Sequence, residues 1–96
     1  MKIAVTFFLI IFYAGISYAQ NAKIDTLNNR INRANTDTGR IKLIIIKVNV
    51  LSNINLDSSI TLALKTLKQA VMIHFYRGEI DLREGLASSF SFKGNY

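Results

Sequence analysis

The histidine and cysteine content of this chain predicts no metal site. His74 is the only histidine among the 96 residues, and cysteine is absent. A zinc site requires several His, Cys or carboxylate ligands at fixed spacing, and none stands near His74. Since His74 continues the apolar stripe of a predicted helix, we predict a partly buried packing residue with no role in catalysis.

The acidic residues and serines likewise predict no active site. Glu79, Asp81 and Glu84 are the only three carboxylates that are close together, and the first turn of a helix accounts for them because its dipole favours negative charge. Ser88 and Ser89 have neither a base partner nor a nucleophile elbow. The chain also lacks a glycine-rich phosphate loop. We therefore predict a protein that is not an enzyme, with no catalytic residue, no cofactor and no metal.

Residues 1–19 have the layout of a secretory signal peptide. Lys2 is the only charged residue, the stretch 3–16 is almost entirely apolar, and small residues follow at the two positions that signal peptidase reads. We predict cleavage between Ala19 and Gln20 and an exported protein, either periplasmic or secreted. The alternative is an uncleaved membrane anchor, because the apolar segment is close to the shortest length that spans a bilayer.

Basic residues outnumber acidic residues, but their distribution argues against a nucleic-acid partner. There are 12 Lys and Arg against 6 Asp and Glu, which gives a net charge of +6. The basic residues occur singly along the chain, without the run that makes a polybasic tail or a patch for DNA. We predict no nucleic-acid partner, and contact with a membrane only if the N-terminal segment is retained.

Apolar residues at helical spacing predict a helix in 20–36 and a second one after it. The first stripe consists of Ile24, Leu27, Ile31 and Ala34. Asp37 or Thr38 is the predicted cap of the next helix. That helix has two apolar faces: Ile41, Ile44, Ile45, Val48 and Leu51 form one, and Leu43, Ile46 and Val50 form the other. Its β-branched residues leave a buried strand as the alternative, but the spacing and length favour a helix.

A turn at 53–57, capped by Asp57 or Ser58, leads into a third apolar stripe. Its members are Ile60, Ala63, Leu64, Leu67, Ala70, Val71, His74 and Phe75. Because the turn is short, the helices on either side pack as an antiparallel hairpin over 37–77. Gly78 is the predicted terminator of this hairpin. A last helix within 78–96 has the stripe Leu82, Leu86, Ala87 and Phe90, and an i,i+4 pair between Glu79 and Arg83.

Three segments of this pattern resemble tetratricopeptide (TPR) repeats. Leu86-Ala87-x-x-Phe90, followed by the Gly-Asn-Tyr turn at 94–96, is similar to the first helix and turn of such a repeat, and 55–67 is similar to the second helix of the repeat before it. Asp37-Thr38-x-Arg40 is similar to the lead-in of TPR proteins of Bacteroidota. The sequence departs from the repeat pattern at Lys47, Leu56, Ser59 and Thr66; the last two stand where the second helix has small alanines.

The resemblance implies an all-α fold of antiparallel helical hairpins, an incomplete α-solenoid preceded by a signal peptide. We interpret the chain as a truncated form of the exported TPR region found in Bacteroidota sensor kinases and regulators. The implied function is protein–protein interaction through helix faces, without catalysis. One alternative is the remnant of a periplasmic sensory region of a two-component system, and another is a membrane-anchored basic helical protein. The predicted interaction surface, left uncovered by a missing helix, consists of Leu86, Phe90, Phe92 and Tyr96.

Overall fold

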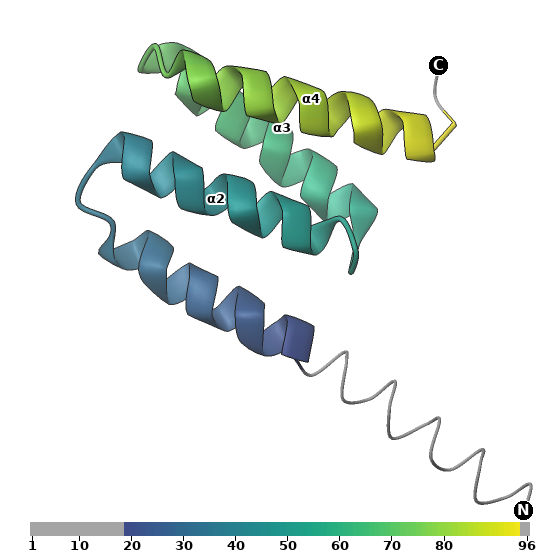
Figure 1. Ribbon diagram of the computed structural model, residues 1–96, viewed down its shortest axis with the longest axis horizontal. Coiled ribbons are helices and arrows are strands. Elements are labelled where there is room, and N and C mark those ends of the chain that lie inside the picture. The colour runs from purple at the N-terminus through teal and green to yellow at the C-terminus, as the bar shows by residue number, and fades with distance from the viewer. Residues whose placement is uncertain (1–18, 95–96) are drawn as a thin grey trace, which may run out of the picture.

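The computed structural model describes residues 19–94, which form four helices packed as sequential antiparallel pairs (Figure 1). A first helical segment covers 19–33. It is followed by α2 (Asp37–Leu51), α3 (Leu56–Met72) and α4 (Tyr76–Phe92). The helical prediction for 41–50 is therefore confirmed, and the strand alternative is wrong. Among the described residues, no helix is both long enough and apolar enough to cross a membrane.

Most of the predicted signal peptide, residues 1–18, lies outside the described residues, as does Tyr96. Ala19 and Gln20, which flank the predicted cleavage site, are the first two residues of the helical segment 19–33. That segment lies beside α2 (Figure 1). Its predicted stripe is its less exposed side: Leu27 is buried, and Ile24 and Ile31 are half-buried.

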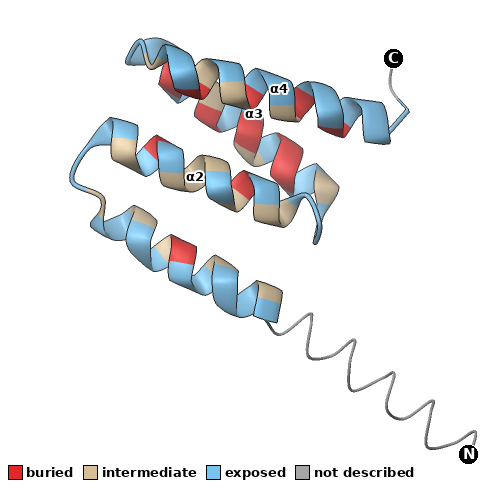
Figure 2. Cartoon of the chain, viewed as in Figure 1, coloured by how far each residue is buried: buried red, intermediate tan, exposed pale blue. Residues whose placement is uncertain are grey.

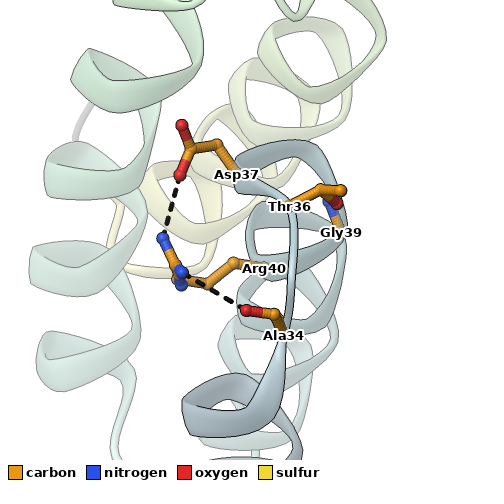
Figure 3. Close-up of polar contacts among 5 residues, drawn as sticks. All are labelled: Ala34, Thr36, Asp37, Gly39 and Arg40. Atoms are coloured by element: carbon orange, nitrogen blue, oxygen red, sulfur yellow. Dashed lines mark hydrogen bonds and ion pairs between the residues drawn. The ribbon is translucent and has the colours of Figure 1, made fainter.

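A small polar cluster joins the first helical segment to α2 (Figure 3). The Thr36 hydroxyl accepts a hydrogen bond from the Gly39 N–H at 3.0 Å and caps α2. The Arg40 guanidinium donates to the Asp37 carboxylate at 3.0 Å and to the Ala34 carbonyl at 3.4 Å. Arg40 therefore connects the end of the first segment to the first turn of α2.

The N-cap residues of α2 and α3 both lie earlier in the chain than the predicted caps. Thr36 caps α2 and Asn55 caps α3, where the Asn55 side chain accepts from the Ser58 N–H at 3.1 Å. A cap residue lies outside the helix with extended backbone, and both residues have this conformation. The predicted caps Asp37 and Asp57 already belong to the first turns of their helices, where the helix dipole still favours their charge.

The core lies where α2, α3 and α4 meet, and α4 packs against both α3 and α2 (Figure 2). Its buried apolar residues are Ile41 and Val48 of α2, Ile60, Ala63 and Ala70 of α3, and Leu82 and Leu86 of α4. The predicted stripes of α2, α3 and α4 therefore all supply core residues, and Leu67 and Phe75 of the α3 stripe pack against the core as half-buried residues.

The buried side of α3 is rotated relative to its predicted stripe. Ser59 and Thr66, which were not predicted to be buried, are 1% exposed, whereas Leu64 and Val71 are 44% and 43% exposed. The Ser59 hydroxyl donates to the Val48 carbonyl of α2 at 2.7 Å. Because α3 packs against both α2 and α4, small hydroxyl residues fit on the side of α3 that faces α2, and larger apolar residues remain at its exposed edge.

The α3 helix ends earlier in the chain than predicted, and a short connection leads from it to α4. α3 ends at Met72, and His74 has a left-handed backbone with φ of 58°. The His74 N–H donates to the Val71 carbonyl at 3.1 Å, and the Phe75 N–H donates to the Ala70 carbonyl at 2.9 Å. These two bonds make a Schellman motif with His74 at the position that glycine usually occupies. His74 is exposed, so the prediction of a partly buried packing residue is wrong.

Gly78 lies inside α4 and does not terminate α3. A Cβ atom added at Gly78 would lie 2.7 Å from Cδ2 of the Phe75 ring. Phe75 packs against the core as a half-buried residue. The absence of a side chain at Gly78 therefore allows the Phe75 ring to fold over the first turn of α4. The predicted pair of Glu79 with Arg83 is present, at 4.0 Å.

Candidate functional site

The predicted interaction surface is divided between three environments. Leu86 belongs to the core, and Phe90 and Phe92 are exposed. Because residues two apart lie on nearly opposite sides of a helix, Phe90 and Phe92 face different surfaces of the molecule. Tyr96 lies outside the described residues. The structure therefore does not bring Leu86, Phe90 and Phe92 together into one patch.

Phe92 borders a groove of about 700 Å³ between α2 and α4. The first turns of α3 contribute to the same groove. Its lining residues from α2 and the following turn are Ile45, Val48, Asn49, Ser52 and Asn53, those from α3 are Leu56 and Ser59, and those from α4 are Asp81, Glu84, Gly85, Ser88, Ser89 and Phe92.

Helical spacing accounts for the α4 wall of the groove. Asp81, Gly85, Ser88 and Phe92 follow one another at intervals of four, three and four residues, which places them along one side of the helix. Gly85 is half-buried, and a Cβ added there would meet no atom within 4 Å. The groove therefore has open space at the middle of this wall.

The charged lining of the groove is acidic, although the whole chain is basic. Asp81 and Glu84 line it, and among residues 19–94 no lysine or arginine does. Arg77 lies near one of these carboxylates, with its Nε atom 3.6 Å from the Asp81 Oδ1 atom. The Arg77 side chain is largely exposed, so water screens this pair and it contributes little. The groove can therefore attract a positively charged group.

The uncharged lining combines amides, hydroxyls and apolar side chains. Asn49 and Asn53 are exposed, and each side-chain amide can both donate and accept hydrogen bonds. Phe92 is 83% exposed and offers apolar surface beside them. Ser59 is already bonded to the Val48 carbonyl. This combination suits an extended peptide, because the amides can pair with a peptide backbone while the ring contacts a side chain.

The structure does not bring His74 together with Ser88 and Ser89. His74 lies in the connection before α4, whereas Ser88 and Ser89 lie in its last turns. Within residues 19–94, no group of three or more His, Cys, Asp or Glu side chains could hold a metal ion. The groove can bind a ligand by shape, hydrogen bonds and charge.

Sequence reasoning missed the groove because its walls are far apart in the chain. Asn49 and Asn53 stand at the end of one helix, and Asp81 and Ser88 stand on another. They share one groove only because α4 packs across α3 onto α2. The sequence feature that could have predicted the α4 wall of the groove is the row of polar residues Asp81, Glu84 and Ser88, which runs beside the predicted apolar stripe of this helix.

Comparison with known proteins assigns no family: the chain matches no family model, no curated protein and no solved structure. Over residues 19–94, the fold defines the class as a four-helix, all-α domain with sequential helix packing.

Proposed function

We propose that this protein is an exported, TPR-like interaction module, without catalysis, that binds a peptide segment of a partner protein in the groove between α2 and α4. One observation carries the proposal: an open groove of about 700 Å³ whose lining mixes amides, carboxylates and apolar surface. The sequential antiparallel packing of the helices is compatible with the resemblance to TPR repeats. Export rests on the layout of residues 1–19.

Binding in this groove uses three kinds of contact. The side-chain amides of Asn49 and Asn53 pair with the peptide backbone, the ring of Phe92 covers an apolar side chain, and Glu84 attracts a lysine or arginine. Ordering a flexible peptide opposes binding. We therefore expect affinities near the micromolar range, about −8 kcal/mol, that weaken as salt screens the exposed carboxylates.

Gly85 provides the sharpest test of the groove. Because a Cβ at this position meets no atom within 4 Å, Gly85→Leu places a side chain in the groove without displacing the core. Gly85→Ala is the matched control, since it raises helix propensity without filling the space. We expect Gly85→Leu to weaken partner binding at least about tenfold, or about 1.4 kcal/mol, and Gly85→Ala to leave it unchanged.

Site-specific photo-crosslinking identifies what occupies the groove. A photoreactive residue at Ser88 lies in the groove, and one at Lys65 is exposed on α3 away from it. We expect the Ser88 variant to form adducts with a peptide of one partner, mapped by mass spectrometry, and adduct formation to be lost with Gly85→Leu. Equal adducts at Ser88 and Lys65, or none from folded protein at either position, would contradict the proposal.

The volume of the groove also favours a second candidate function. Small-molecule pockets commonly measure about 300–1,000 Å³, so the groove could hold a small ligand, as in a remnant of a periplasmic sensory region of a two-component system. Under this alternative, a small molecule raises the melting temperature of the wild-type protein but leaves that of Gly85→Leu unchanged, and no peptide adduct forms at Ser88.

The N-terminus of the protein purified from its native host tests export separately. A sequence that begins at Gln20 supports cleavage of residues 1–19 and an exported protein. A sequence that begins at Met1 favours instead a membrane-anchored basic helical protein. Neither result changes the expectation for Gly85→Leu, since the groove is built from residues 45–92.

A further inference from the structure

We propose that the outer side of the α3–α4 hairpin is a second docking surface, and that it binds an amphipathic helix of a partner protein with acidic side chains within its apolar face. This surface is independent of the groove between α2 and α4. It consists of two strips, Leu64, Lys68 and Val71 on α3, and Tyr76, Ile80, Arg83, Ala87 and Phe90 on α4.

The strip on α4 is a second helical stripe beside the buried one. Its members follow one another at intervals of four, three, four and three residues, and all are exposed. Tyr76 and Ile80 are 67% and 50% exposed. This spacing is that of the apolar positions in a helix that packs against another helix. In α4, Leu82 and Leu86 already supply the core, so the second stripe has no partner among the described residues.

The strip on α3 lies on the side of that helix away from α2. Ser59 marks the side that faces α2, because its hydroxyl donates to the Val48 carbonyl. Leu64 stands five residues later and is exposed. Asp57, seven residues before Leu64 and therefore on its side of the helix, pairs with Lys93 at the end of α4. The strip on α3 therefore borders α4, and the two strips flank the seam between these helices.

The packing of α4 indicates that the occupant is a helix. α4 rests on α3 and α2 together, and so covers the hairpin that precedes it. The same step repeated once places a further helix on α4 and α3 together, and that helix would meet both strips. Because isolated apolar residues on a surface are common but helically spaced rows are the pattern of a helix contact, the geometry suits an amphipathic helix better than an extended peptide.

The charges select an acidic helix. Lys68 lies between Leu64 and Val71, and Arg83 lies between Ile80 and Ala87, so each apolar strip has a basic residue at its middle. Glu79 reaches Arg83 only at 4.0 Å, and the Arg83 side chain remains 63% exposed. The Glu79 side chain is 17% exposed, but the contact is long and the guanidinium remains open to solvent, so Arg83 can also pair with a carboxylate of the docked helix. Opposite charges there would set the orientation of the partner and its rate of association.

A pair of synthetic helices tests this proposal on protein expressed from the full 96-residue sequence. Both labelled peptides have the 17-residue length of α4 and leucines at the apolar positions; one has glutamates within the apolar face and the other lysines. Fluorescence anisotropy measures their binding. We expect the glutamate peptide to bind at least about tenfold more tightly than the lysine peptide.

Charge reversal and apolar replacement give the decisive variants. Lys68→Glu combined with Arg83→Glu should invert the preference, so that the lysine peptide binds more tightly. Leu64→Asn combined with Ile80→Asn should abolish binding of both peptides, while Phe92→Asn, in the groove, should leave it unchanged. The substituted residues are all exposed, and circular dichroism verifies that each variant stays helical.

Three results would overturn the proposal. One is equal binding of the two peptides. Another is a preference for the glutamate peptide that survives charge reversal. The third is failure to bind either peptide while vesicles of anionic phosphatidylglycerol bind through Ile80 and Arg83, which would assign the surface to a membrane. The crosslinking result at Ser88 is independent of these outcomes, because that residue lines the groove and is not part of either strip.

Discussion

The α2–α3 interface and the α3–α4 corner fix helix positions by different means. At the α2–α3 interface, the buried Ser59 hydroxyl donates to the Val48 carbonyl at 2.7 Å. At the α3–α4 corner, the Phe75 ring occupies the space that a side chain at Gly78 would need. The first contact is a directional hydrogen bond, and the second is close van der Waals packing of the Phe75 ring against the backbone at Gly78.

This difference predicts different tolerance to substitution. Removing a hydroxyl loses one hydrogen bond but leaves the Val48 carbonyl paired with the Ser52 N–H at 3.0 Å. Adding a methyl group where a ring already lies forces atoms apart, because packed interiors have little free volume. We therefore expect the corner to be the less tolerant of the two regions, and the following variants test that ranking.

Gly78→Ala should have the largest effect. The new Cβ would lie 2.7 Å from the Phe75 ring, so we expect the free energy of unfolding to fall by about 2 kcal/mol, measured by urea denaturation. The control is the same substitution with Phe75→Ala. Without the ring, Gly78→Ala should instead stabilise the double variant relative to Phe75→Ala by about 1 kcal/mol. The same loss in both backgrounds would exclude the ring as the cause.

Ser59→Ala should destabilise the protein by about 1 kcal/mol, the typical net value of one hydrogen bond. Ser58→Ala is the matched control, because the neighbouring Ser58 is exposed and should change the unfolding free energy little. If Ser59→Ala proves more costly than Gly78→Ala, the ranking of the two regions is wrong.

Gly85→Ala tests whether the intolerance of Gly78 comes from its surroundings. Both glycines lie in α4, but a Cβ at Gly85 meets no atom within 4 Å. We expect Gly85→Ala to raise the unfolding free energy by about 1 kcal/mol, because alanine has the higher helix propensity. Thermal denaturation would show this as a higher melting temperature. A loss of stability would mean that the groove wall is more crowded than its geometry indicates.

The smallest effect is expected at His74, which completes the corner. Its φ of 58° costs an L-residue energy that glycine avoids, although glycine also gains entropy in the unfolded chain. We therefore expect His74→Gly to stabilise the protein by about 0.5 kcal/mol. His74→Ala should be less stable than His74→Gly. Equal stability of these two variants would show that the left-handed backbone at residue 74 is not strained.

Helical periodicity predicted the existence and order of the helices, because apolar spacing depends on residues close in sequence. It predicted the buried side of α3 only in part: Ile60, Ala63 and Ala70 are buried as expected, but Ser59 and Thr66 are buried as well, through their fit against neighbouring helices. The end of α3 was also misplaced: glycine is the usual Schellman residue, and the prediction therefore chose Gly78 over His74. The groove could not be predicted, because its walls meet only after α4 folds back onto α2.

Sequential packing of the helices determines the order in which they unfold locally. α3 has a neighbour on each side, α2 and α4, whereas α4 exposes a complete helical stripe. In a linear array each element is held mainly by its neighbours, so opening begins at the ends and spreads inward. Backbone amides near Ala63 and Thr66 should therefore exchange their hydrogens with solvent most slowly, and amides near Phe92 much faster. A helix docked on α4 would slow amide exchange at that end, so that local unfolding would then begin mainly at the N-terminal end of the array.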